Sequence, residues 1–137
     1  MSSHPPSRIL VVEDERHIAK FLEFVLQKEG YEVDSVYDGD AAIQILDSRK
    51  YSAVLLDLGL PGRSGIEVLR DLRSTNEHAE TVVIVLTAKS SGDMLQQLSD
   101  AGASAHCPKP VAPSTLFRKL KELGVAEECF AVTEQAR

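Results

Sequence analysis

The segment AVLLDLGLPG, residues 53–62, has the pattern of a buried strand that runs into a tight loop. Its first four residues are all apolar, as expected for a parallel strand whose two faces are both covered by helices. The apolar run ends at the carboxylate of Asp57, and the glycines and the proline that follow indicate a turn. Residues 9–14 repeat this pattern, because an apolar strand there ends in Glu13 and Asp14.

Short apolar runs alternate with segments of helical period along most of the chain, which is typical of βα units around a parallel sheet. Gly30 suits the end of the first helix, and Pro113 suits the first turn of the last one. The sequence therefore predicts an α/β fold with a doubly wound, five-stranded parallel sheet whose short, polar second strand lies at an edge. The expected strands are residues 9–12, 31–37, 53–57, 82–86 and 104–107.

Composition and charge argue against several classes of function. With 137 residues, the chain is long enough for one domain with a proper core. The net charge of −6 argues against a primary role in binding nucleic acid or an anionic membrane surface. No apolar run approaches the ~20 residues of a membrane helix, and the start does not resemble a secretory signal. Cys107 and Cys129 have no metal-binding spacing and suit a reducing compartment, so we expect a cytoplasmic protein.

Polar side chains collect where the predicted strands end. Asp57 ends the third strand, and the other four strand-end residues are Glu13 and Asp14 after the first, Thr87 after the fourth and Lys109 after the fifth. In open α/β sheets, ligands bind outside the carboxyl ends of the strands, where the strand order reverses. For the strand order 2-1-3-4-5 that place lies between the first and third strands, so we expect the three carboxylates to meet there.

Three neighbouring carboxylates repel one another at neutral pH, so such a cluster either takes up protons or holds a cation. Mg²⁺ prefers oxygen ligands and keeps positions for water or phosphate oxygens. Lys109 would bring a positive charge to a phosphoryl oxygen, and Thr87 would bring a hydroxyl donor. Asp57 is then the candidate nucleophile, since a carboxylate can attack phosphorus to form an aspartyl phosphate. The predicted reaction class is phosphoryl transfer.

These residues resemble the receiver domain of two-component response regulators, the CheY-like superfamily, over about residues 7–123. The resemblance implies a flavodoxin-like (βα)5 fold with strand order 2-1-3-4-5. It leaves residues 1–6 as a disordered leader and residues 124–137 as a C-terminal tail or the start of a linker. The motifs that carry it, together and in order, are Glu13-Asp14, residues 55–62 with Gly65, Leu86-Thr87-Ala88, Gly102-Ala103 and Lys109-Pro110.

The resemblance implies that Asp57 accepts a phosphoryl group from a phosphohistidine on a sensor histidine kinase or a histidine phosphotransfer protein. The receiver itself would catalyse this transfer and the later dephosphorylation without being a conventional turnover enzyme. The implied cofactor is Mg²⁺, or Mn²⁺ in its place. Asp14 and Asp57 would ligate the metal directly, Glu13 would act through a water molecule, and Gly59 would ligate through its backbone carbonyl.

Further roles follow from the same resemblance. Lys109 would pair with the phosphoryl group, and its peptide bond to the following proline is expected to be cis. Thr87 and His106 are the expected switch residues, which move inward after phosphorylation. Gly59 and Lys89 would line the path of the hydrolytic water, so we expect them to modify the lifetime of the phosphate.

The implied function is a phosphorylation-controlled signalling switch. The face formed by the fourth helix, the fifth strand and the last helix would change its affinity for a downstream protein partner. Neither nucleic acid nor membrane is an expected direct partner, and the chain would be a monomer or a phosphorylation-dependent homodimer. The residues after Leu123 are too few for an output domain, so we expect either a stand-alone receiver or the excised receiver of a larger regulator or hybrid kinase.

Simpler interpretations exist for single residues. Asp57 taken alone would be an ordinary helix cap, since Asp is common at caps. His106 would be a tolerated ring on a half-buried edge strand. The other histidines, His4, His17 and His78, show no ligand spacing to each other and are expected at the surface.

Other functions on related chemistry or the same fold are also open to test. An aspartyl phosphatase usually has a second Asp two positions after the nucleophile, where this chain has Gly59. A flavodoxin-like cofactor binder needs a first loop that cradles phosphate, whereas Glu13-Asp14-Glu15 would repel it. A receiver that no longer accepts phosphate is disfavoured, because every side chain needed for the transfer is present.

Overall fold

A five-stranded parallel sheet forms the centre of the part of the chain that the computed structural model describes, residues 7–88 and 92–125. Its strand order, β2-β1-β3-β4-β5, confirms the predicted fold, and β2 lies at an edge. The strands are β1 (Arg8–Val12), β2 (Glu32–Val36), β3 (Ala53–Asp57), β4 (Val82–Thr87) and β5 (Ala105–Pro108). The helices are α1 (Arg16–Lys28), α2 (Gly39–Ser48), α3 (Gly65–Arg73), the short 3-10 helix η1 (Asn76–His78), α4 (Gly92–Ala101) and α5 (Pro113–Glu122).

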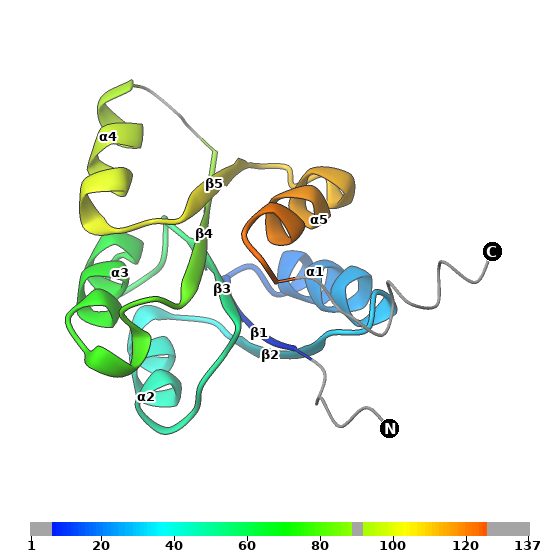
Figure 1. Cartoon of the computed structure of the whole chain (residues 1–137), viewed down its shortest axis with the longest axis horizontal. Coiled ribbons are helices and arrows are strands. Elements are labelled where there is room, and N and C mark those ends of the chain that lie inside the picture. Colours follow the sequence, from blue (N-terminus) through cyan, green and yellow to red (C-terminus); the bar gives the residue numbers. More distant parts are fainter. Residues whose placement is uncertain (1–6, 89–91, 126–137) are drawn as a thin grey trace.

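The helices form a layer on each side of the sheet. Helices α1 and α5 cover one face, and α2, α3 and α4 cover the other (Figure 1). Because alternate residues of a strand point to opposite faces, Ile9 and Val11 pack with α1 and α5, whereas Leu10 and Val12 pack with the other three helices. This double coverage explains the nearly continuous apolar runs of the central strands. Among the described residues, no helix is long and apolar enough to cross a membrane.

The ends of α1 and α5 lie where the sequence predicts them. Gly30 follows the end of α1 with a φ of 100°, a conformation that glycine adopts without steric cost. Pro113 is the first residue of α5. The fifth strand, however, begins at residue 105 rather than 104. The hydroxyl of Ser104 accepts the Val83 amide hydrogen at 3.0 Å. A side chain therefore takes the place that a backbone carbonyl would have if Ser104 belonged to the strand.

His78 is buried, which corrects the expectation that it lies at the surface. Its side chain is only 4% exposed, and Nε2 donates a hydrogen bond to the carbonyl oxygen of Leu46 at 2.7 Å. The helix η1, which the sequence pattern does not reveal, turns the chain beneath the end of α2 and brings the ring to this carbonyl. A polar ring with a hydrogen-bond partner can be buried at little cost, so spacing alone does not predict its exposure.

The guanidinium group of Arg73 connects the end of α3 to two loops. Nε donates to the carbonyl oxygen of Gly102 at 2.9 Å, and Nη1 donates to that of His78 at 2.8 Å. Burial lowers the pKa of Arg73 from its usual value. These two hydrogen bonds fix the chain before β4 and before β5, so they help to align the two strands that carry Thr87 and His106.

Replacing Arg73 with Met is expected to lower the free energy of unfolding by about 3 kcal/mol or more, because it removes two hydrogen bonds from a charged donor and each contributes about 1.5–3 kcal/mol. The measurement is urea unfolding followed by circular dichroism. Arg70→Met is the matched control, since Arg70 lies on the same helix and is exposed, and its effect should stay within about 0.5 kcal/mol. Equal effects of the two substitutions would contradict this role for Arg73.

Candidate functional site

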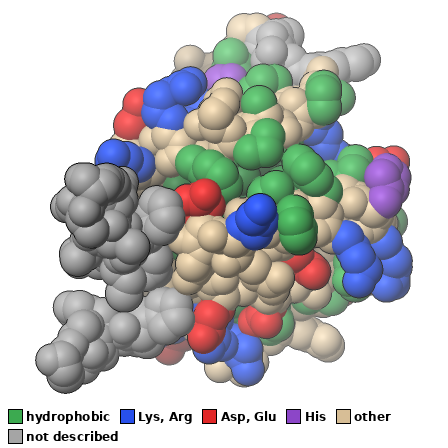
Figure 2. Space-filling view, turned by 90° about the vertical axis from the view of Figure 1, so that its right-hand side faces the viewer, with side chains coloured by type: hydrophobic (Ala, Val, Ile, Leu, Met, Phe, Trp, Pro, Cys, Tyr) green, Lys and Arg blue, Asp and Glu red, His purple; other side chains and the backbone are tan. Residues whose placement is uncertain are grey.

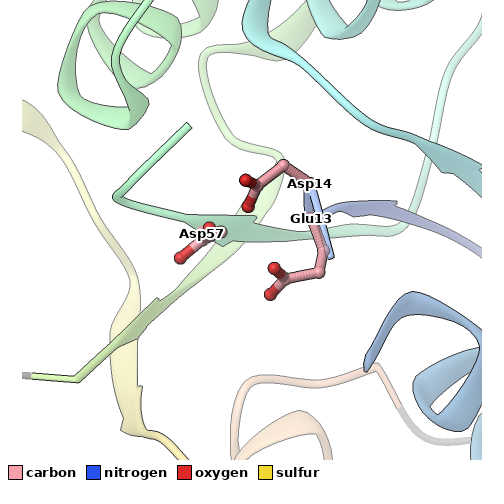
Figure 3. A group of neighbouring side chains, drawn as sticks. All are labelled: Glu13, Asp14 and Asp57. Atoms are coloured by element: carbon pink, nitrogen blue, oxygen red, sulfur yellow. The ribbon is translucent and has the colours of Figure 1, made fainter. Parts of the chain in front are cut away.

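Three carboxylates gather at the carboxyl ends of β1 and β3. Glu13 and Asp14 follow β1, and Asp57 is the last residue of β3. Each side chain offers an oxygen atom, and these three atoms lie within 4.8 Å of one another (Figure 3). Glu13 is fully buried and Asp57 is 5% exposed, whereas Asp14 is open to solvent. The structure therefore brings together the three carboxylates that the sequence places at this edge of the sheet.

The local backbone holds the carboxylate of Glu13 in this position. Strands β1 and β3 are paired with Val12 opposite Leu56, so the residues that follow each strand are neighbours. The Glu13 amide donates to the carbonyl oxygen of Val36 at 3.1 Å, which continues the pairing of β1 with β2 by one step. Oε2 of Glu13 accepts the Glu15 amide hydrogen at 3.2 Å, which leaves Oε1 facing the cluster.

Lys109 brings a positive charge into the acidic cluster. Its Nζ lies 3.0 Å from Oε1 of Glu13 and 3.0 Å from Oδ1 of Asp57. The Lys109–Pro110 peptide bond is cis, and the Lys109 amide donates to the carbonyl oxygen of Thr87 at 3.0 Å. Burial opposes the charged form of Lys109, but the hydrogen bonds and the attraction of the two carboxylates outweigh it and raise its pKa. The pKa of Glu13 is raised, chiefly by burial.

The donor atoms of this cluster fit a hard divalent cation. Among the described residues, Oε1 of Glu13 is a buried oxygen with no hydrogen-bond partner beyond its 3.0 Å contact with the ammonium group of Lys109. One ammonium group faces three carboxylates, so negative charge remains in excess. Oxygen ligands with excess negative charge, one of them open to solvent, are the setting in which Mg²⁺ binds while keeping several waters.

The structure places three of the remaining residues that the sequence singles out, Thr87, His106 and Gly59. Thr87 ends β4 and is 5% exposed, opposite Pro108 in the register of β4 and β5. His106 is half-buried in the edge strand β5, where Cys107 points to the opposite face and packs in the core. Gly59 is exposed in the loop after β3, and a Cβ there would meet no atom within 4 Å. Lys89 lies outside the described residues.

Two exposed aromatic side chains on α1 were not recognised from the sequence as surface features. Phe21 is 45% exposed and Phe24 is 60% exposed. Figure 2 views the side formed by α1 and α5, and hydrophobic side chains gather in the middle of that face. In the sequence, Phe24 does not fall on the apolar stripe of α1, and this position could have indicated that its ring is exposed. A cavity of about 220 Å³ lies beside the ring of Phe21, and it is lined by His17, Ile18, Phe21, Leu22, Lys109, Pro110 and Val111.

Residues 9–121 match the family model described as the response regulator receiver domain. Among solved structures, the chain is similar to the chemotaxis response regulator CheY4 of Vibrio cholerae, with 26% sequence identity and a TM-score of 0.82. That match covers 86% of this chain and 98% of the other. A putative response regulator from Chloroflexus aurantiacus is 29% identical with a TM-score of 0.82, over 86% of this chain and 97% of the other.

A third similar structure contains a metal ion. It is the receiver domain of the sensor histidine kinase PA1611 from Pseudomonas aeruginosa, which has a magnesium ion coordinated in its active site cleft. The two chains are 28% identical with a TM-score of 0.79, and the match covers 87% of this chain and 98% of the other.

Proposed function

Because the chain belongs to the response regulator receiver family of two-component signalling, we propose that it is a phosphorylation-controlled switch whose phosphoryl acceptor is Asp57. The observation that carries this proposal is the ammonium group of Lys109, 3.0 Å from the Asp57 carboxylate inside an acidic cluster. The test is Mg²⁺-dependent labelling of the chain by a small phosphodonor, with Asp57→Asn as the decisive variant.

The transfer step is a substitution at phosphorus. A bond forms between a carboxylate oxygen of Asp57 and phosphorus, the P–N bond of the phosphohistidine breaks, and its electron pair leaves with the imidazole nitrogen. Lys109 exchanges its contact with Asp57 for one with a phosphoryl oxygen, and the Thr87 hydroxyl donates to another.

The proposed cation ligands are side chains of the acidic cluster and one backbone carbonyl. Asp14 and Asp57 would bind Mg²⁺, or Mn²⁺, directly, Glu13 would act through water, and Gly59 would offer its carbonyl oxygen. A bound divalent cation supplies positive charge between the carboxylate and the phosphoryl oxygens, which would otherwise repel. The buried oxygen of Glu13 and the solvent-open carboxylate of Asp14 support this assignment.

The proposed output runs from Thr87 to the surface formed by α4, β5 and α5. Thr87 and Lys109 are linked by a backbone hydrogen bond, and both lie at the ends of the strands that border this surface. A phosphoryl group that attracts the Thr87 hydroxyl would leave space that His106 fills from β5. The α4-β5-α5 face would then change its affinity for a downstream protein, or for a second copy of the chain.

The proposed phosphodonor approaches over the exposed aromatic face of α1. The cavity beside Phe21 is lined by both α1 and Lys109, so a partner seated there lies next to the proposed reaction centre. Phe21 and Phe24 offer apolar surface to the helices of a histidine kinase or histidine phosphotransfer protein. Exposed aromatic rings of this kind are common anchors of protein interfaces.

The double variant Phe21→Ala/Phe24→Ala is expected to slow phosphoryl transfer from a protein donor about tenfold or more, since anchor residues each contribute over about 1 kcal/mol. Labelling by acetyl phosphate should not change, because that donor needs no docking surface. The protein donor is an autophosphorylated histidine kinase domain, chosen from a panel by its transfer to the wild-type chain. Gln27→Ala on the same helix is the control. An equal loss with both donors, or no loss with the kinase, would contradict the docking role.

A further inference from the structure

Residues 36–40, which run from the end of β2 into the first turn of α2, contact the loop that carries Glu13 and Asp14. At the start of this segment, the carbonyl oxygen of Val36 accepts the Glu13 amide hydrogen at 3.1 Å. Within it, the ring of Tyr37 lies under the guanidinium group of Arg16, with 3.9 Å between the guanidinium carbon and the ring centroid. Residues 36–40 therefore contact the β1–α1 loop at Glu13 and the first residue of α1 directly after that loop.

The same segment packs against the loop between β3 and α3. Gly39 is buried, and a Cβ added there would lie 2.4 Å from the carbonyl oxygen of Arg63 and 2.9 Å from its Cβ. The φ of Gly39 is not in the left-handed region, so glycine is needed here for space rather than for backbone conformation. Arg63 Nε also donates to Oδ1 of Asp40 at 3.2 Å. Backbone thus meets backbone without any side chain between.

The far end of the β3–α3 loop is also held tightly. A Cβ at Gly65 would lie 2.6 Å from the carbonyl oxygen of Asp57, so the two ends of the loop are in close contact. The side chains of Ser64 and Glu67 form a capping box that fixes the start of α3. A displacement at Arg63 must therefore be absorbed within residues 58–63, the segment that contains Gly59.

We propose that residues 36–40 act as a brace that fixes the two cation-binding loops relative to each other, with Gly39 as its positioning residue. This inference rests on the proposed function, because the cation is held by groups on both loops. Residues that orient metal ligands from outside the ligand set typically change metal affinity about 10–100-fold when they are replaced. The brace belongs to this class, since it touches both loops and no reacting atom.

The experiment compares Gly39→Ala with the wild-type chain. Mg²⁺ binding is measured by calorimetry, and the rate of acetyl phosphate labelling is measured against Mg²⁺ concentration. The dissociation constant and the half-saturating Mg²⁺ concentration are expected to rise about tenfold, while the rate at saturating Mg²⁺ changes much less. Gly92→Ala is the matched control, because a Cβ at Gly92 would meet no atom within 4 Å.

A second variant keeps the test decisive if Gly39→Ala does not fold. Tyr37→Leu removes the contact with Arg16 and keeps an apolar side chain, and it is expected to raise the half-saturating Mg²⁺ concentration about threefold. Unchanged Mg²⁺ affinity in every folded variant, with normal binding by the wild-type chain, would overturn the brace alone. A wild-type chain that binds no Mg²⁺ would overturn the proposed function and the brace together.

Discussion

Asp57→Asn is expected to abolish Mg²⁺-dependent labelling by acetyl phosphate and to leave the fold intact. An amide oxygen carries no net charge and is a far weaker nucleophile than a carboxylate, so the bond to phosphorus does not form. The substitution is nearly isosteric at a position that is 5% exposed, and it keeps an oxygen for the contact with Lys109. Intact-protein mass spectrometry should show the added phosphoryl group on the wild-type chain and none on the variant.

The matched control for this experiment is Asp47→Asn. Asp47 is exposed on α2, away from the acidic cluster, so its variant should be labelled like the wild-type chain. Omission of Mg²⁺ should suppress labelling of both. Labelling of the Asp57→Asn chain at the wild-type rate would mean that another side chain is the acceptor, and it would remove the basis of the proposed function.

The sequence predicts the fold and the acidic cluster for the same physical reason. Parallel strands end at one edge of their sheet, so residues at the ends of apolar runs meet without any knowledge of distances. This places Glu13, Asp14 and Asp57 together, as the structure does, with Lys109 beside them. Strand boundaries follow from the length of each apolar run, which is why β3 matches the prediction to the residue and the short β5 is displaced by one.

Features that depend on contacts between segments far apart in the sequence were not predicted. The burial of His78 requires the carbonyl of Leu46, which is 32 residues away, and no local pattern specifies that contact. The close approach of Gly39 to Arg63 likewise depends on two segments that are distant in the sequence. A single glycine in a sequence can have many structural roles, so the sequence alone does not reveal this one. Phe21 fits the helical period of the buried residues of α1, but the apolar surface of this helix is wider than the area that the sheet covers, so Phe21 stays partly exposed.

Lys109→Met is expected to slow acetyl phosphate labelling about a hundredfold, because a positively charged donor aimed at developing negative charge contributes on this scale. The same variant should bind Mg²⁺ more tightly than the wild-type chain. The ammonium group lies 3.0 Å from oxygens of both Glu13 and Asp57, so it competes with a cation for the same carboxylates. If the labelling rate and the Mg²⁺ dissociation constant both fall, the slower labelling results from lost stabilisation of the phosphoryl group and not from a damaged metal site.

The stability of Lys109→Met should depend on Mg²⁺ more strongly than the stability of the wild-type chain does. Removing the ammonium leaves the fully buried carboxylate of Glu13 beside Asp57 without a compensating charge, and this should lower the free energy of unfolding by about 3 kcal/mol in the absence of Mg²⁺. A divalent cation restores the missing charge, so saturating Mg²⁺ should recover most of the loss. Urea unfolding with and without Mg²⁺ measures both effects, and Lys121→Met, which alters an exposed lysine on α5, is the control. If Mg²⁺ stabilises Lys109→Met no more than it stabilises the wild-type chain, the lysine and the cation do not share these carboxylates.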